Sequence, residues 1–246
     1  DSNAEDLIGI AKTILDMPEP GYREFKTSKF TEEQFNKYGF SNIEKVSMTG
    51  LKAVIDTGRP GPTVCVMGEL DSLVVLGHPH ADSETDAAHA CGHHIQLGNM
   101  LASLIGLNSN EILNNLSGSI TFIAVPAEEY VEIEWRSSQR DQGKFEFLGG
   151  KQEFVKLGAF DDIDISISSH GSSNNTILWQ EVPMGEGMSL ATSKSVYKFH
   201  GKASHAAINP DQGVNALNSV IMLFNGIDSL RQHLKDDARV HGIITD

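Results

Sequence analysis

Residues 86–96, DAAHACGHHIQ, form the segment of this sequence best suited to metal or thiol chemistry. Three of the ten histidines and one of the two cysteines lie in it. Cys91 and His93 are two residues apart, so in an extended segment both side chains would leave the same face and converge on one metal ion. A small buried cysteine explains Cys91 about equally well. The segment is therefore consistent with a metal site, a catalytic thiol or a polar loop.

Two other segments place candidate ligands at the ends of expected strands. The apolar run SGSITFIAVPAEE ends in Glu128 and Glu129, whose charges would repel each other if both were buried without a cation. Successive residues of an extended backbone point in different directions, so one carboxylate could bind a metal ion while the other addresses a water. A solvated strand end is the alternative. His170 follows the strand-like ISIS and is either a further ligand or a surface histidine.

These candidates combine thiolate, imidazole and carboxylate groups from separate segments: Cys91, His93, Glu129 and His170. Such a mixed set of soft and hard ligands suits zinc or a manganese-like ion, and Glu128 then remains as a general base. Asp71, in GELDSL, follows another strand-like run. Asp71 could bind a ligand histidine and orient it without itself binding the metal, or it could cap the strand end.

The elements that must position these residues alternate between helical and strand-like patterns. Helices are expected at about residues 7–15, 28–38 with Gly39 behind it, 95–107 and 149–160, and strands within 51–70, 117–129 and 162–171. Helices alternating with strands that end in polar residues are typical of an α/β sheet whose strand ends carry a site.

The pattern changes from about residue 188. Residues 195–207 and 239–245 are strand-like, and residues 211–234 carry apolar side chains on one helical face. We interpret this part as a second α+β unit, incomplete with one helix and two strands. The predicted domains are residues 1–187 and 188–246.

The charge balance excludes several partners. Lysine plus arginine count 19 against 33 aspartate plus glutamate, a formal net charge of −14. Without a basic patch, such a chain repels nucleic acid and anionic membrane surfaces. No apolar run approaches the ~20 residues of a membrane helix, and no signal-peptide pattern opens the chain, so we expect a soluble, cytoplasmic protein. Cys65 lies in a strand-like run, which argues against a disulfide framework.

Five segments resemble, in order and spacing, a family of metallopeptidases. The family contains aminoacylases, glutamate carboxypeptidases and the plant hydrolases of auxin-amino-acid conjugates. The segments are GELDSL, HACGHHIQLGNMLA, VPAEEY, GGKQEFVKLGAFDDIDISISSH and FHGKASHAAINPDQGVNALNSV. Among its branches, the p-aminobenzoyl-glutamate hydrolase-like and auxin-conjugate hydrolase-like ones are nearest, and CGHH and GAFDD favour the first.

The resemblance implies a fold and a site. The fold would be α/β, with a mixed-sheet, exopeptidase-like catalytic domain that binds two metal ions and an inserted α+β lid domain that forms a homodimer. Zinc or manganese would be held by Cys91, His93, Glu129 and His170. Glu128 would be the general base, and His205, in GKASHAA, would match the lid histidine that reaches the substrate in the partner subunit.

The sequence also departs from the family pattern. His94 replaces an aspartate common elsewhere in the family, and Gln96 stands where many members have histidine. Both departures leave the shape of the pocket, and therefore the substrate, open. Members of the family continue beyond the equivalent of Asp246 and add another ligating histidine, so we expect this chain to be a fragment or a shortened homologue.

The expected activity is hydrolysis of an amide bond in an N-acyl or aminoacyl amino acid or a dipeptide. A metal-bound water would attack while Glu128 accepts its proton, with no covalent intermediate. One alternative is a cysteine hydrolase that uses Cys91, which predicts sensitivity to thiol reagents and indifference to chelators. Another is a catalytically silent dimerisation or small-molecule-binding protein with the same fold.

Overall fold

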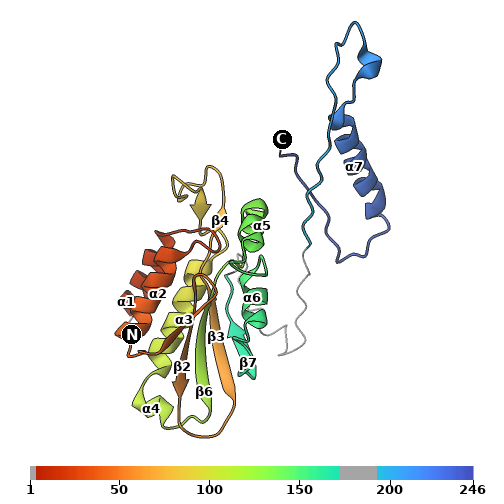
Figure 1. Cartoon of the computed structure of the whole chain (residues 1–246). Coiled ribbons are helices and arrows are strands. Elements are labelled where there is room, and N and C mark those ends of the chain that lie inside the picture. Colours follow the sequence, from red (N-terminus) through yellow and green to blue (C-terminus); the bar gives the residue numbers. More distant parts are fainter. Residues whose placement is uncertain (1–3, 172–192, 246) are drawn as a thin grey trace. The chain divides into compact units, whose positions relative to one another are not determined.

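The computed structural model describes residues 4–171 and 193–245 (Figure 1). The chain divides into two compact units, residues 1–175 and 176–246. The domain boundary predicted between residues 187 and 188 lies outside the described residues. No helix of the described part is both long and apolar enough to cross a membrane.

A five-stranded mixed sheet forms the centre of the first unit. Its strands lie in the order β1-β2-β6-β3-β7. β1 pairs with β2 and β2 with β6 in antiparallel fashion, whereas β3 is parallel to both β6 and β7. The bounds are β1 Ile43–Val46, β2 Gly50–Asp56, β3 Thr63–Glu69, β6 Ser119–Val125 and β7 Ile165–Ser168. The predicted α/β class with a mixed sheet is confirmed.

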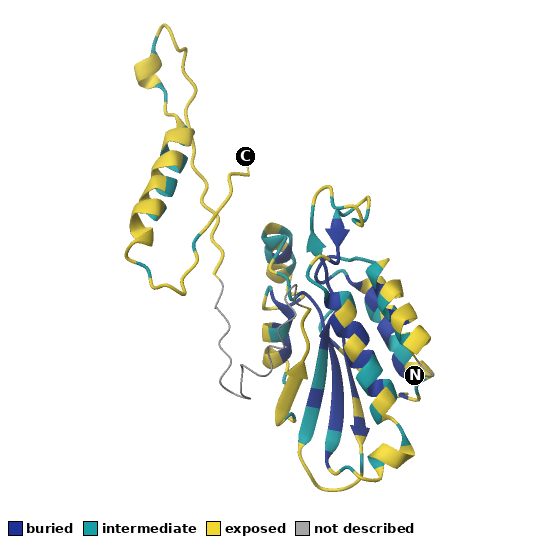
Figure 2. Cartoon of the chain, turned by 180° about the vertical axis from the view of Figure 1, so that it is seen from behind, coloured by how far each residue is buried: buried dark blue, intermediate teal, exposed yellow. Residues whose placement is uncertain are grey.

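Strand β6 is buried on both faces, which explains its nearly continuous apolar sequence. Phe122 and Ala124 pack in a core with residues of α1, α2 and α3 on one face of the sheet. Ile123 and Val125, which point the other way, pack against Phe154 of α6 on the opposite face. Figure 2 shows these buried segments in the sheet and in the helix surfaces that cover it.

The helices of the first unit agree with the predicted ones, with two additions. Their bounds are α1 Ala4–Leu15, α2 Phe25–Lys37, α3 His93–Leu107, α4 Asn110–Leu113, α5 Ile133–Asp141 and α6 Gly150–Lys156. Gly39 follows α2 with a φ of +93°, the left-handed conformation expected behind a helix. The short α4, the polar α5, strand β1 and the small ribbon of β4 (Leu73–Val74) and β5 (Ala87–Ala88) were not predicted.

One local prediction is wrong. Cys91 and His93 do not lie in an extended segment, because His93 is the first residue of α3. Gly92 between them has a φ of 101°, a left-handed conformation that turns the chain into the helix and that glycine adopts without steric cost.

The second unit contains one long helix, α7 (Ala216–Arg231), and a short 3-10 turn at Pro210–Gln212. The strands predicted at 195–207 and 239–245 are absent from its described residues, where a single bridge joins Lys202 to Val214. A strand requires a hydrogen-bonded neighbour, and these segments have none beyond that bridge. Apolar side chains such as Leu217, Ile221 and Met222 of α7 are exposed.

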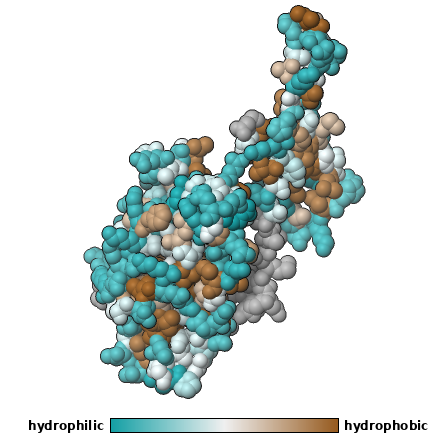
Figure 3. Space-filling model, in the orientation of Figure 1, coloured by the Kyte–Doolittle hydropathy of each residue, from teal (hydrophilic) through white to brown (hydrophobic). Residues whose placement is uncertain are grey.

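Surface hydropathy differs between the units. In the view of Figure 3 the first unit is mostly hydrophilic with small apolar areas, whereas apolar side chains are prominent on the second.

The start of α6 lies directly on the loop that follows β6. The Gly150 amide donates to the Ala127 carbonyl over 3.1 Å. A Cβ atom at Gly150 would overlap the carbonyl oxygen of Pro126, so only glycine permits this approach.

We expect Gly150→Ala to lower the free energy of unfolding by about 1–3 kcal/mol through this overlap. The matched control is Gly106→Ala in α3, where a Cβ meets no atom within 4 Å. Gly106→Ala should raise the free energy of unfolding by up to about 1 kcal/mol. Urea denaturation measures both changes, and equal stabilities of the two variants would contradict this packing.

Candidate metal centre

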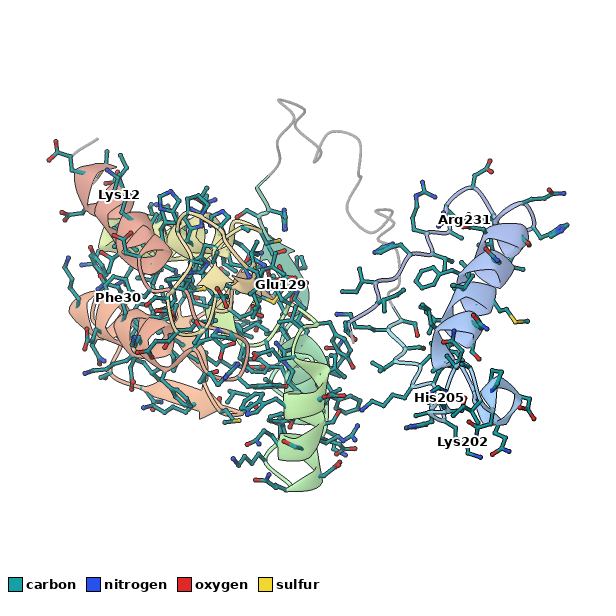
Figure 4. All side chains as sticks on the ribbon, turned by 90° about the horizontal axis from the view of Figure 1, so that it is seen from above. Lys12, Phe30, Glu129, Lys202, His205 and Arg231 are labelled. Carbon is teal, nitrogen blue, oxygen red and sulfur yellow. The ribbon has the colours of Figure 1, made fainter. Side chains whose placement is uncertain are left out.

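The candidate residues of the first unit gather at one edge of its sheet. Three parallel strands end there, with Glu128 and Glu129 after β6, Asp71 after β3, and His170 after β7. Figure 4 looks down on this unit from above and labels Glu129. Helix α3 packs against β3, where a Cβ atom at Gly68 would lie 3.0 Å from the Cα of Leu97. This close approach positions the start of α3, with Cys91 and His93, at the same edge.

His93 is the buried centre of this cluster, with 1% of its side chain exposed. On one side, its Nδ1 lies 2.8 Å from the backbone oxygen of Asp71 and 3.3 Å from Oδ1 of the same residue. On the other side, its Nε2 lies 3.0 Å from Glu69 Oε2. Nε2 is also 3.8 Å from Glu128 Oε2 and 3.8 Å from Glu129 Oε1.

These contacts define the protonation of the ring. A carbonyl oxygen only accepts, so Nδ1 carries a proton and donates it to Asp71. The lone pair of Nε2 then faces carboxylate oxygens, and only a cation, either a proton or a metal ion, relieves that repulsion. Burial alone would lower the pKa of His93, but the neighbouring carboxylates of Asp71 and Glu69 outweigh it and raise the pKa to about 11.

Cys91 and His170 form a second pair beside His93. The distance from Cys91 Sγ to His170 Nε2 is 3.5 Å. Nδ1 of His170 lies 2.7 Å from the carbonyl oxygen of Gly171, so this ring also has Nε2 free as a ligand. Burial, followed by a hydrogen bond and the charge of Glu129, raises the pKa of the Cys91 thiol to about 11.

Asp71 connects two of the candidates. Its side chain is fully buried, and its Oδ2 accepts a hydrogen bond of 2.9 Å from the Glu129 amide. Because its backbone oxygen and Oδ1 face His93, Asp71 fixes the positions of His93 and Glu129 relative to each other.

The donor atoms fit a bound divalent cation. Two sets have ligand atoms within 4.8 Å of one another, Cys91 with His93 and His170, and Glu69 with His93 and Glu128. Glu129 belongs to neither set. In the part of the chain that the structure describes, several buried atoms here lack a hydrogen-bond partner: Glu69 Oε2, Asp71 Oδ1, His93 Nε2 and Glu129 Oε1. A cation would satisfy such atoms.

Sequence reasoning missed two members of this cluster. The Nζ atom of Lys151 forms an ion pair with Glu69 and lies 3.5 Å from Glu128 Oε1. Burial alone would raise the pKa of Glu69, but the neighbouring His93 and Lys151 lower it to about 2. The position of Glu69 at the end of a buried strand, two residues before Asp71, was a usable signal. Lys151 offered none, because it lies in an ordinary amphipathic segment.

The two positions that depart from the family pattern have different environments. Gln96 is buried, and its side-chain oxygen accepts a hydrogen bond of 2.9 Å from the Glu69 amide. His94 is partly buried, and the centre of its ring is 5.4 Å from that of His89. Burial, with a smaller contribution from His93, lowers the pKa of His94.

His205 lies in the second unit, and its role stays a prediction. Its side chain is exposed, and Nδ1 accepts hydrogen bonds of 3.2 Å from the Ala207 and Ile208 amides. Figure 4 labels it beside Lys202.

Known proteins resemble the chain in sequence and in fold. Over 242 residues it is 26% identical to one of the subunits of p-aminobenzoyl-glutamate hydrolase from Escherichia coli (strain K12), covering 96% of this chain and 45% of that protein. Over 181 residues it is 30% identical to Xaa-Arg dipeptidase from Mus musculus, covering 74% of this chain and 34% of that protein. No protein-family model matches.

The fold matches that of the Bacillus subtilis YXEP protein, described as a dinuclear metal binding peptidase from the M20 family. The TM-score is 0.55 at 21% identity, and the match covers 68% of this chain and 43% of that chain. The resemblance predicted from the five segments is therefore confirmed. The chain spans less than half the length of the two curated relatives.

Gln96→Leu should lower the free energy of unfolding by about 1–3 kcal/mol, because the buried Glu69 amide loses its acceptor. Chemical denaturation in the presence of a chelator measures this change without any contribution from metal.

The control is Ile95→Ala, a change at the exposed residue next to Gln96. It should change the free energy of unfolding by no more than about 0.5 kcal/mol. If Gln96 were instead a metal ligand, Gln96→Leu would weaken metal binding and leave the stability of the chelated protein unchanged.

Proposed function

We propose that this site binds two divalent metal ions, zinc or manganese, and hydrolyses an amide bond in an N-acyl or aminoacyl amino acid or a dipeptide. The observation that carries the proposal is the environment of His93. Its Nε2 faces three carboxylates, next to the Cys91 and His170 pair. A cytoplasmic location and a homodimer formed through the second unit belong to the same proposal.

Divalent ions bound here would polarise the amide carbonyl and lower the pKa of a water. Cys91, His93 and His170 would hold them together with Glu129, whose Oε1 lies 3.8 Å from His93 Nε2. Asp71 would orient the imidazole of His93. Glu128 would accept the proton of the attacking water and then donate it to the leaving amine.

The two adjacent glutamates differ in surroundings, which supports different roles. The side chain of Glu128 is 34% exposed, whereas that of Glu129 is 16% exposed. The Glu129 amide is bound to Asp71, which holds this residue toward the buried His93. Glu128 is the more accessible group, as a base that must meet a water and a substrate requires.

The names of the relatives support the substrate class. A hydrolase of p-aminobenzoyl-glutamate and a dipeptidase both cleave an amide bond to an amino acid.

The cysteine-hydrolase alternative is less well supported. Burial raises the pKa of the Cys91 thiol, whereas a nucleophilic cysteine depends on a thiolate that is stabilised by its surroundings. Within the same cluster, a thiolate bound to a cation would not be free to attack a substrate.

His205 would stabilise the developing oxyanion in a neighbouring subunit. Two backbone amides donate to its Nδ1, so the proton of the neutral ring is on Nε2. The exposed Nε2–H is then a donor held in a defined orientation, as an oxyanion requires.

Exhaustive chelation of the whole protein should abolish hydrolysis of N-acyl amino acids, aminobenzoyl-glutamate or dipeptides, and added zinc or manganese should restore it. Glu128→Gln should keep its metal content and lose turnover by at least ~10²–10⁴-fold, since it removes only the base. Glu129→Gln should weaken metal binding by about tenfold or more.

Elemental analysis and turnover, measured on the same preparations, separate the two variants. Activity that survives chelation contradicts the metal mechanism, and it would favour the cysteine hydrolase if thiol reagents then inhibit. Bound metal with no turnover of any of these substrates would favour a silent homologue.

Mixing tests the shared site of the proposed homodimer. Glu128→Ala and His205→Ala proteins should each be inactive, and subunit exchange should restore activity toward roughly a quarter of the wild-type level, because about half the dimers are mixed and each has one intact site. Mixing two batches of His205→Ala protein is the control. Demonstrated exchange without recovery would place His205 in its own subunit's site or outside the reaction.

A further inference from the structure

We propose that Glu24 is a positioning residue for the loop that carries Glu128 and Glu129, an inference that rests on the function proposed above. Glu24 precedes α2 and is fully buried. Its Oε1 accepts a hydrogen bond of 2.7 Å from the Ala127 amide, which immediately precedes Glu128. Its Oε2 accepts one of 2.6 Å from the hydroxyl of Thr49.

The side chain of Glu24 does not cap the N-terminus of α2, although its position in the chain would allow it. It occupies the N-cap position of α2, yet its side chain makes no capping hydrogen bond. Glu19 caps the helix instead, because its carboxylate accepts hydrogen bonds from the Lys26 and Thr27 amides in the first turn of α2. The carboxylate of Glu24 is thereby available for a contact with a residue 103 positions later in the chain.

Ala127 needs such a contact. Its φ of 50° is left-handed, a conformation that costs free energy in a residue with a Cβ atom and persists only where the surroundings impose it. Its amide donates to Glu24, and its carbonyl accepts from Gly150. Gly21, three residues before Glu24, approaches so closely that a Cβ there would lie 2.8 Å from the Ala127 Cα.

The loop is therefore held by carboxylates on both sides of Glu128. Glu24 binds the amide before it, and Asp71 binds the amide of Glu129 after it. Gly150 and Asp71 hold the two peptide groups that flank Glu128, and Glu24 holds the peptide group before them. The backbone of Glu128 therefore has little freedom to rotate, and its carboxylate keeps its direction toward the edge where His93 lies. Loss of the Glu24 contact would leave a base of the correct chemistry with a poorly defined direction.

Amide hydrogen exchange of the metal-free full chain tests this contact, with the amides of β6 as an internal reference for global opening. Glu24→Ala should accelerate exchange at Ala127 and Glu128 by about tenfold or more relative to β6. Glu24→Gln retains an oxygen at the same reach and should keep exchange close to wild type. Glu24→Asp retains the charge but shortens the side chain, so it should behave like Glu24→Ala.

The matched control is Glu19→Ala, which removes a carboxylate of the same segment that does not contact the loop. It should leave the exchange of Ala127 relative to β6 unchanged. If Glu24→Ala does not fold, the opposite responses of the Gln and Asp variants still decide the question.

Unchanged loop exchange in Glu24→Ala or Glu24→Asp, or acceleration that is equal in β6, would overturn the proposal. So would a Gln variant that opens the loop while the Asp variant keeps it closed. In the whole protein, Glu24→Ala should also lower kcat more than it changes KM, and Glu24→Gln should restore kcat. Because exchange is measured without metal or substrate, a failure of the proposed function would appear in the chelation experiment and leave the exchange result intact.

Discussion

The hydrogen bond from Nδ1 of His93 to the backbone oxygen of Asp71 is the interaction on which the rest of the site depends. It directs Nε2 toward Glu69, Glu128 and Glu129. Placing several carboxylates around one imidazole in a buried position is expensive, since ions lose their hydration there. Lys151 offsets part of that charge. The remainder is the physical reason why this edge of the sheet favours a bound cation.

The parallel pairing of β3 with β6 and β7 makes this concentration of charge possible. Parallel neighbours end at the same edge, so residues from distant parts of the chain meet without long loops. The close packing at Gly68 brings the start of α3 to that edge as well. Because β6 is buried on both faces, its end cannot shift without disturbing two cores.

The sequence predicted the parts that depend on local patterns. Apolar periodicity indicated α1, α3 and the central strands, and strand ends indicated Glu128, Glu129 and His170. Contacts across the fold were beyond such reasoning, because no local pattern shows that Lys151 reaches Glu69, or that Glu24 reaches Ala127. The turn at Gly92 was missed because the spacing of Cys91 and His93 fits an extended segment as well as a helix start. The strands expected in the second unit failed for a related reason, since strand-like residues form a strand only beside a partner.

A change of residue in a family motif therefore has to be interpreted through its contacts. Gln96 stands where many members of the resembled family have histidine, which suggests a lost polar contact near the proposed metal site. In this chain the amide oxygen of Gln96 accepts from the backbone of Glu69, the residue whose carboxylate faces Nε2 of His93. Gln96 thus acts on the site through the strand end that it holds. A departure from a family motif can leave the donor set intact, while a substitution at a residue such as Glu24, outside every motif considered above, can change the direction of the base.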